Sequence, residues 1–163
     1  MRLLSLRLGV ALGATYNYVP NKRALLQLVA SELDSRVEAH SELTDGFDQA
    51  KSVMLQIHDV FAGYPGMGAY VALHVPEFAS ESLVKMITDP LCRAGLSPAE
   101  ANQITLALVL INVGHMLVEM PPKLQKRAER ALEDGVDLIL EGARARLKRS
   151  RRSSRATSAT LPH

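Results

Sequence analysis

Seven side chains with polar tips or polarisable surfaces occur on otherwise apolar stretches in the middle of the sequence. These are His58, Phe61, Tyr64, Tyr70, His74, Met86 and His115. Because ligand pockets combine an apolar lining with a few polar groups, this set predicts a small-molecule site. The alternative is that His115 is a histidine of the core or of an interface, and that the methionine fills the core.

The sequence contains no catalytic signature that its spacing supports. It lacks a GxSxG motif, a phosphate-binding loop and an HExxH motif. His74 and Glu77 are three residues apart, but Pro76 disrupts the helix that would align them on a metal. The single cysteine, Cys92, excludes an intrachain disulfide and a CxxC site. We therefore expect no enzymatic activity, no metal and no cofactor.

The N-terminal part of the chain has the pattern of three helices separated by glycine and proline. A helix before Gly9, a tight turn, a short second helix and Pro20 are followed by Asn21, a good N-cap. This order is the helix-turn-helix layout with a connecting helix behind it. The connecting helix is predicted to reach about Glu42, since apolar residues recur every four positions at Leu25, Val29, Leu33 and Val37.

The stretch from Leu3 to Leu26 resembles the DNA-binding head of regulators of the tetracycline-repressor (TetR) family. The residues in register with the family pattern are Gly9-Val10, Gly13, Tyr16, Lys22 and Leu25. The resemblance covers about residues 1–33. It implies an all-α, TetR-like fold in which an incomplete helix-turn-helix head precedes a helical effector-binding and dimerisation domain.

The same resemblance implies a set of contacts with double-stranded DNA, made by Gly13, Ala14, Thr15, Tyr16, Asn17, Tyr18 and Lys22. The two small residues permit close approach to base edges, and the threonine and asparagine can make polar or methyl contacts there. The tyrosines can donate to phosphates, and the lysine adds a charge at the start of the next helix. Alternatively, Tyr16 is partly core, Asn17 is solvated and Asn21 serves only as a cap.

The sequence departs from the family pattern at its beginning. In the family another helix of the head precedes this stretch, and Met1 stands where an internal apolar residue is usual. Leu4, Leu8 and Val10 would then lack their usual packing partner. We expect the natural start to lie upstream of Met1. The alternative is a relic that does not bind an operator.

Four further helices are predicted in the body. They span Asp48 to Ala62, Ser80 to Gly95, a stretch from the capping pattern at Ser97 onward, and a stretch from Pro122 onward. The last two carry apolar seams wider than one core needs, so helices spanning residues 97–118 and 122–147 are predicted to form a symmetric dimer interface, with Gly135 and Gly142 in the seam. An intrachain bundle is the alternative.

Charge is unevenly distributed along the chain. Residues 1–23 hold four basic residues and no acid, residues 24–143 hold eight bases and seventeen acids, and residues 144–163 hold seven bases and no acid. Basic ends around an acidic body suit a protein that meets a polyanion, although short charged runs can simply be solvated. The sequence after Lys148 has few apolar residues and is expected to be disordered.

These features divide the chain into residues 1–42, a partial DNA-binding head with its connecting helix, residues 43–148, an effector-binding and dimerisation domain, and residues 149–163, a basic tail. We expect a cytoplasmic, homodimeric transcriptional regulator, and we expect it to repress transcription rather than to activate it. A small-molecule effector would release it from its DNA operator. The alternative function is a dimeric ligand-binding relic of the same fold that no longer binds DNA.

Overall fold

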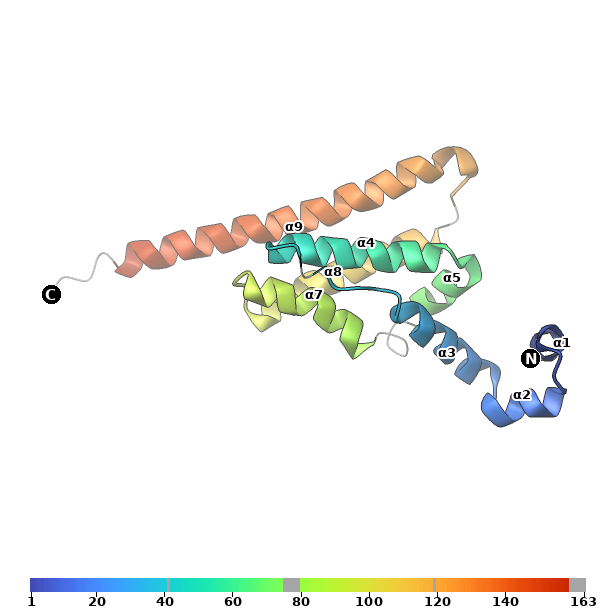
Figure 1. Ribbon diagram of the computed structural model, residues 1–163. Coiled ribbons are helices and arrows are strands. Elements are labelled where there is room, and N and C mark those ends of the chain that lie inside the picture. Colours follow the sequence, from blue (N-terminus) through green and yellow to red (C-terminus); the bar gives the residue numbers. More distant parts are fainter. Residues whose placement is uncertain (41, 75–79, 119, 159–163) are drawn as a thin grey trace.

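Helices make up all the regular structure in the described residues of the computed structural model, which are 1–40, 42–74, 80–118 and 120–158 (Figure 1). The head and connector contain α1 (Arg2–Leu8), α2 (Leu12–Tyr18) and α3 (Lys22–Asp34). The body contains α4 (Gly46–Ala62), α5 (Pro65–Leu73), α7 (Glu81–Arg93), α8 (Pro98–Leu117) and α9 (Pro122–Ser158). The expected all-α class is therefore confirmed.

The residues that end and begin the helices of the head explain their bounds. Gly9 ends α1 in the left-handed conformation, with φ 67° and ψ 25°, which glycine adopts without steric cost. Its backbone N–H donates to the carbonyls of Leu6 and Ser5, and α2 packs back against α1. At the start of α3, the Asn21 side chain accepts from the Ala24 N–H at 2.8 Å, as expected of an N-cap.

The connecting helix is shorter than its apolar spacing predicts. It ends at Asp34, whereas the sequence predicted a helix to about Glu42. Val37 is buried, but it belongs to the non-helical segment that follows. Beside it, the Glu38 backbone N–H donates to the Gln56 side chain at 3.1 Å, and the Gln56 amide donates back to the Glu38 carbonyl at 3.1 Å. Tertiary packing of this segment on α4 therefore replaces the last helical turns.

Helix α4 forms the centre of the body. It contacts α3, α5, α7, α8 and α9, and its inward residues Ala50, Val53 and Met54 are at most 1% exposed. Gly46 at its start lies so close to the Pro90 carbonyl of α7 that a Cβ atom would collide with it. This close approach, together with the Asp45 N-cap, fixes the first turn of α4 against α7.

The predicted start of α8 is confirmed in detail, whereas α5 was missed. The Ser97 side chain caps the Glu100 N–H, and the Glu100 carboxylate accepts from the Ser97 backbone N–H at 2.9 Å, which forms a complete capping box. The glycines and the proline between Tyr64 and Gly68 predict a break between helices. Pro65 instead opens α5, because proline suits the first helical turn.

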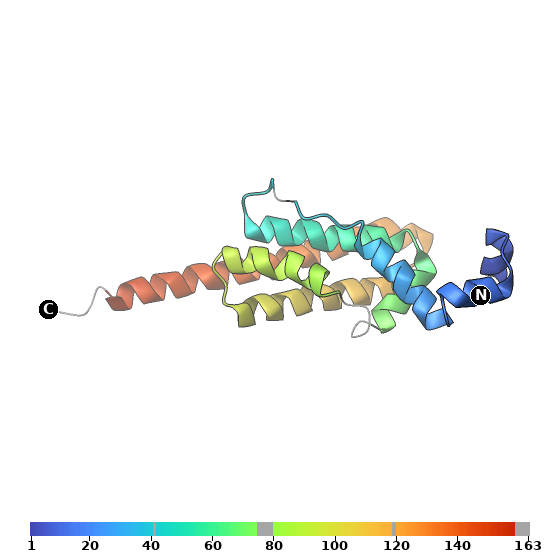
Figure 2. The ribbon, with the colours of Figure 1, turned by 60° about the horizontal axis from the view of Figure 1, so that its bottom comes forward.

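Helix α9 continues to Ser158, which corrects the expectation of disorder from residue 149. The chain has no glycine or proline between Gly142 and that residue, and Arg, Lys and Ala are strong helix formers. Residues 159–163 lie outside the described residues. The last turns of α9 extend beyond the body, at the end opposite to the head (Figures 1 and 2). The two basic segments are thus far apart in one chain.

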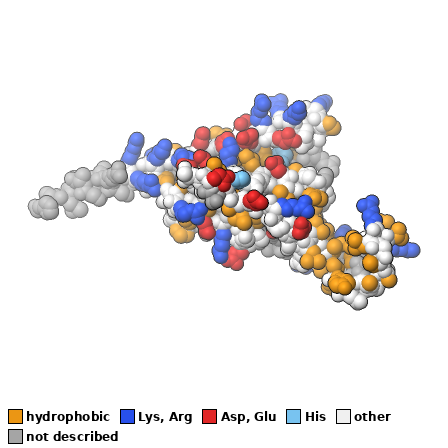
Figure 3. Space-filling model, in the orientation of Figure 1, with side chains coloured by type: hydrophobic (Ala, Val, Ile, Leu, Met, Phe, Trp, Pro, Cys, Tyr) orange, Lys and Arg blue, Asp and Glu red, His pale blue; other side chains and the backbone are white. Residues whose placement is uncertain are grey.

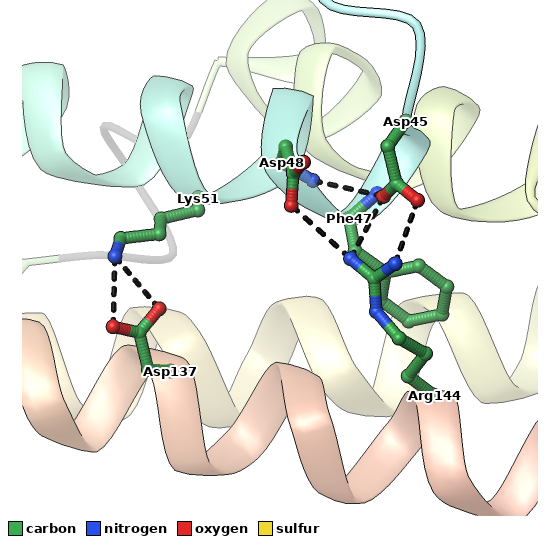
Figure 4. A network of polar contacts seen from close by, with 6 residues as sticks. All are labelled: Asp45, Phe47, Asp48, Lys51, Asp137 and Arg144. Atoms are coloured by element: carbon green, nitrogen blue, oxygen red, sulfur yellow. Dashed lines mark hydrogen bonds and ion pairs between the residues drawn. The ribbon is translucent and has the colours of Figure 1, made fainter.

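A polar network joins α9 to the start of α4 (Figure 4). Arg144 donates to both Asp45 carboxylate oxygens at 2.7 and 2.9 Å, and its guanidinium lies 4.7 Å from the centre of the Phe47 ring. Burial by itself would raise the pKa of Asp45. The Arg144 guanidinium and two backbone N–H groups more than offset that effect, so this pKa lies below its ordinary value.

None of the described helices combines the length and the apolar composition that crossing a membrane requires.

We predict that Arg144→Met lowers the free energy of unfolding by about 1–2 kcal/mol at pH 7, because a bidentate but half-exposed ion pair is lost. The folded-state pKa of Asp45 is depressed, so the stabilisation is present above the unfolded pKa of about 3.9 and is lost as pH falls through the lower folded value. Urea unfolding at neutral and acidic pH measures both effects.

Arg130→Met is the matched control, because Arg130 lies on the same helix and is exposed. An equal loss of stability in the two variants would show that the network contributes nothing specific.

Candidate functional site

A cavity of about 90 Å³ lies where the end of α3 meets α4, α5, α7 and α8. Most of its lining is apolar and includes Met54, Ile57, Phe61, Ile87, Val109 and Met116. Three polar residues also line it, namely Asp34 at the end of α3, Ser80 at the start of α7 and Asn112 in α8. An apolar cavity with few polar groups is the usual form of a small-molecule site.

Asn112 is the innermost polar residue of this lining, with 4% of its surface exposed. Its amide donates to the Met54 carbonyl at 3.3 Å and contacts the Met54 sulfur at 3.0 Å. Its carbonyl oxygen lies 3.2 Å from Nδ1 of His58. Since the amide oxygen can only accept, Nδ1 of His58 carries the proton and donates. Both ends of the amide are thus already bonded within the protein.

His58 continues this contact chain to His115. The two rings meet edge to face, with centroids 4.6 Å apart and an interplanar angle of 81°. Burial lowers the pKa of His115, and the neighbouring His58 lowers it further, against smaller opposing effects from the Ala128 backbone and Glu129 of α9. A line of packed polar groups therefore runs from the cavity through α4 and α8 to α9.

Asp34 differs from Asn112 in its surroundings. It is the last residue of α3, and its side chain is only half-buried. Burial raises the pKa of its carboxyl, and a hydrogen bond with the Ser80 side chain opposes that rise. A negative charge at a helix C-terminus is also unfavourable toward the helix dipole. A carboxylate held in such surroundings is a candidate for contact with a ligand.

The structure brings together only part of the ligand set predicted from sequence. Phe61 lines the cavity, while His58 and His115 stand behind Asn112. Tyr64 is 43% exposed and its hydroxyl accepts from Arg36 at 2.9 Å.

The remaining three members of the set lie elsewhere. Tyr70 and His74 stack on each other with ring centroids 4.3 Å apart, outside the cavity lining. Met86 lines a separate, more polar hollow of about 290 Å³ between α4 and α7, together with His40 and Asp89. Glu77 and Pro76, considered beside His74, lie outside the described residues. The described residues hold no group of three or more potential metal ligands.

Sequence reasoning missed the three polar residues of the cavity. Asn112 carries a usable signal, because it is a lone amide in an otherwise apolar helix, where a buried polar group needs partners. Asp34 carries no such signal in the sequence. The predicted connecting helix continued past it to about Glu42, so Asp34 looked like an ordinary acidic residue on the surface of that helix. Ser80 was recognised only as the beginning of a helix.

Most of the predicted DNA-contacting residues are on the surface of the head. Gly13, Tyr16, Asn17, Tyr18 and Lys22 are exposed, with Tyr18 at 86%. Ala14 is half-buried, and the side chain of Thr15 lies outside what the structure describes. Asn21 also has the capping role considered as its alternative.

The head also exposes a large apolar surface, which Figure 3 shows as a cluster of hydrophobic side chains. Leu3, Leu6 and Leu8 are 80%, 76% and 61% exposed, and Val10 is 45% exposed. Leu8 and Val10 are therefore uncovered, as expected, whereas Leu4 is half-buried. The described residues of the body do not cover these side chains.

A second exposed apolar face runs along α8 and α9. Leu106, Leu110 and Leu138 are 58%, 60% and 71% exposed. Leu138 and Gly142 also line a groove of about 330 Å³ between the two helices. Gly135 does not belong to this face, because a Cβ atom there would collide with the Ile111 side chain of the same chain. Only the second of the two seam glycines thus lies where a partner could approach.

Neither a comparison with models of known protein families nor one with curated proteins found a match to this chain. The resemblance of residues 1–33 to the TetR head therefore stays a prediction.

We predict that Asp34→Asn stabilises the protein at pH 7, by about 0.3–1 kcal/mol from the helix dipole alone. The folded-state pKa of Asp34 is raised, so its carboxyl favours folding below the unfolded pKa and this contribution is lost as pH rises through the folded pKa. The difference between variant and wild type should therefore vanish at acidic pH in thermal unfolding.

Asp59→Asn is the control, because Asp59 is an exposed aspartate in the last turn of α4 and shares the dipole effect without the burial. A gain from Asp59→Asn as large as that from Asp34→Asn would contradict the role assigned to burial.

Proposed function

We propose that the protein is a dimeric, DNA-binding transcriptional regulator that acts as a repressor. A small-molecule effector would release it from its operator. The observation that carries this proposal is that the cavity is lined by Asp34, the last residue of the helix that leads back to the head. A ligand in the cavity therefore contacts the element that positions α2. A ligand shifts such an equilibrium when it binds one arrangement more tightly than the other.

The surface of the head supports the DNA part of the proposal. Its exposed side chains include two tyrosines, an asparagine and Lys22, which are groups that contact phosphates and base edges. Residues 1–23 hold four basic residues and no acid, whereas the body is acidic. An electrostatic preference of a polyanion for the head over the body follows from this distribution. The basic turns at the end of α9 lie at the opposite end of the chain from the head (Figure 1).

The exposed leucines of α8 and α9 support the dimer. A second copy of the same face would cover them around a two-fold axis, and the open space at Gly114 and Gly142 allows helices to approach closely. A dimer also holds two heads at a set separation, as half-sites about one turn of DNA apart require.

A second function is favoured by one specific observation. The exposed leucines of α1 leave the head with little packing of its own, and a helix-turn-helix positions its reading helix by packing it on the others. A dimeric ligand-binding protein that does not bind DNA is therefore the alternative.

DNA binding is tested by selecting duplexes from a random pool with the purified chain and measuring affinity by fluorescence anisotropy. We predict that Lys22→Gln weakens binding to every selected duplex and lowers the salt slope by about 1, because one phosphate contact is lost. Lys123→Gln, an exposed lysine at the start of α9, should leave both quantities unchanged. Enrichment of no sequence would reject the proposal in favour of the alternative.

Dimerisation is tested by sedimentation of Leu110→Glu. A charge placed on the shared face should convert the dimer to a folded monomer, because the side chain is already 60% exposed within one chain. Leu28→Glu, at a leucine of α3 that is 56% exposed, is the control and should remain dimeric. A monomeric wild-type chain, or a dimeric Leu110→Glu variant, would refute this interface.

A further inference from the structure

The cavity where α3 meets α4, α5, α7 and α8 presents an almost entirely apolar surface. Its walls include the buried side chains of Met54, Phe61 and Ile87. A hollow of this kind attracts a ligand through the apolar area that leaves water on binding. Recognition therefore depends on size and apolar contact, unless a polar residue of the lining is free to bond a ligand.

Two of the three polar residues of the lining are bonded to each other. The Ser80 hydroxyl donates to the Asp34 carboxylate and accepts from the Leu83 backbone N–H at 3.1 Å. A hydroxyl has a single proton, so this donor is already used. Both residues are half-buried, which leaves the pair in contact with solvent. This pair therefore belongs to the margin of the cavity and gives its interior no polar anchor.

The third polar residue, Asn112, is also fully engaged. Its amide donates to the Met54 carbonyl, and its carbonyl accepts from Nδ1 of His58. A ligand that bonded to Asn112 would have to displace one of these buried contacts, which is costly. A polar group that entered the cavity without such a bond would lose its hydrogen bonds to water and gain none. The lining thus selects against polar and charged ligands.

The volume of the cavity limits the size of the ligand. An apolar cavity of about 150 Å³ stays dry and accommodates benzene. At the same density, the volume of about 90 Å³ observed here accommodates roughly four carbon atoms. Met54 and Met116 contribute flexible, polarisable side chains to the wall, so the cavity can adapt to the shape of a compact ligand.

We propose that the cavity binds a small, uncharged hydrocarbon of roughly four carbon atoms. The ligand would contact Phe61, which packs with Ala30 and Leu33 of α3. This inference narrows the proposed function and rests on it only for the consequence of binding, which is movement of α3 and release of DNA. Binding itself requires only the cavity.

The experiment is a titration of the full chain, labelled with ¹³C at the methionine methyl groups, and followed by NMR. The probes are n-butane, 1-propanol, n-propylamine and acetate, which have the same number of non-hydrogen atoms. We expect butane to shift the methyl signals of Met54 and Met116, which line the cavity. The signal of Met86, which lines the separate hollow between α4 and α7, should stay in place as an internal control.

The polar probes measure the selectivity of the lining. We expect 1-propanol to bind about 10-fold to 100-fold more weakly than butane, because its hydroxyl finds no free partner. The propylammonium and acetate ions should leave the signals of Met54 and Met116 unchanged, since burial of an unpaired charge costs more than burial of a hydroxyl. An amine or acetate that binds as tightly as butane would overturn the inference.

A variant that fills the cavity gives a second test. Ala72 lines the cavity and is 8% exposed, so the three carbon atoms added by Ala72→Leu should occupy the space of the ligand and abolish the response to butane. Ala62→Leu, at the exposed last residue of α4, is the matched control and should keep that response. Butane that leaves Met54 and Met116 of the wild-type chain unshifted would also overturn the inference, whether or not Ala72→Leu folds.

The same probes separate this inference from the proposed function. Butane that binds beside Met54 and Met116, in a chain that selects no DNA sequence, would support the inference and reject the regulator. A selected duplex that propylamine or acetate releases, and that butane does not, would support the regulator and reject the hydrocarbon as its effector.

Discussion

The enclosure of α4 by five other helices is the constraint on which the rest of the structure depends. Its inward residues are almost completely buried, and its start is held against α7 by the close contact of Gly46 with Pro90 and against α9 by Arg144. Well-packed interiors do not deform continuously, so elements packed on α4 have few alternative positions. The cavity lies at the edge of this packing, where α3 leaves the body. A ligand bound there would act on the least constrained of the elements that contact α4.

The polar chain from Asn112 to His115 gives the same cavity a connection toward α9. Each member is buried or half-buried, and the bonds of Asn112 hold α8 in register with α4. Replacement of Asn112 or of His58 by an apolar residue would leave the other without its buried hydrogen-bond partner, at a cost of about 1–3 kcal/mol. The side of α8 that bears Asn112 faces the cavity, and the side that bears Leu110 is exposed. One helix thus separates the candidate ligand site from the candidate dimer face, and a change in its position would affect both.

Local signals in the sequence predicted much of the fold. The capping box at Ser97 and the turn at Gly9 depend on neighbouring residues alone, so they were recognisable without tertiary information. The end of α3 was not, because Val37 continues the apolar period although it lies in a non-helical segment that packs on α4. Gly135 and Gly142 look equivalent in sequence, and only packing against Ile111 distinguishes them. The cavity escaped prediction for a similar reason: its polar residues come from three helices, and no periodicity relates Asp34, Ser80 and Asn112.

The exposed apolar surface of the head has an energetic consequence for this arrangement. Burial of a leucine contributes about 1.5–3 kcal/mol, and Leu3, Leu6 and Leu8 are mostly exposed, so the head gains little of that stabilisation. Elements with few buried contacts open at low free energy, whereas the core around α4 opens only near the full free energy of unfolding. The head is connected to that core through α3, whose buried residues Ala30 and Leu33 pack with Phe61. Because Phe61 also lines the cavity, the contact that fixes the head to the body and the contact that a ligand would make share one side chain.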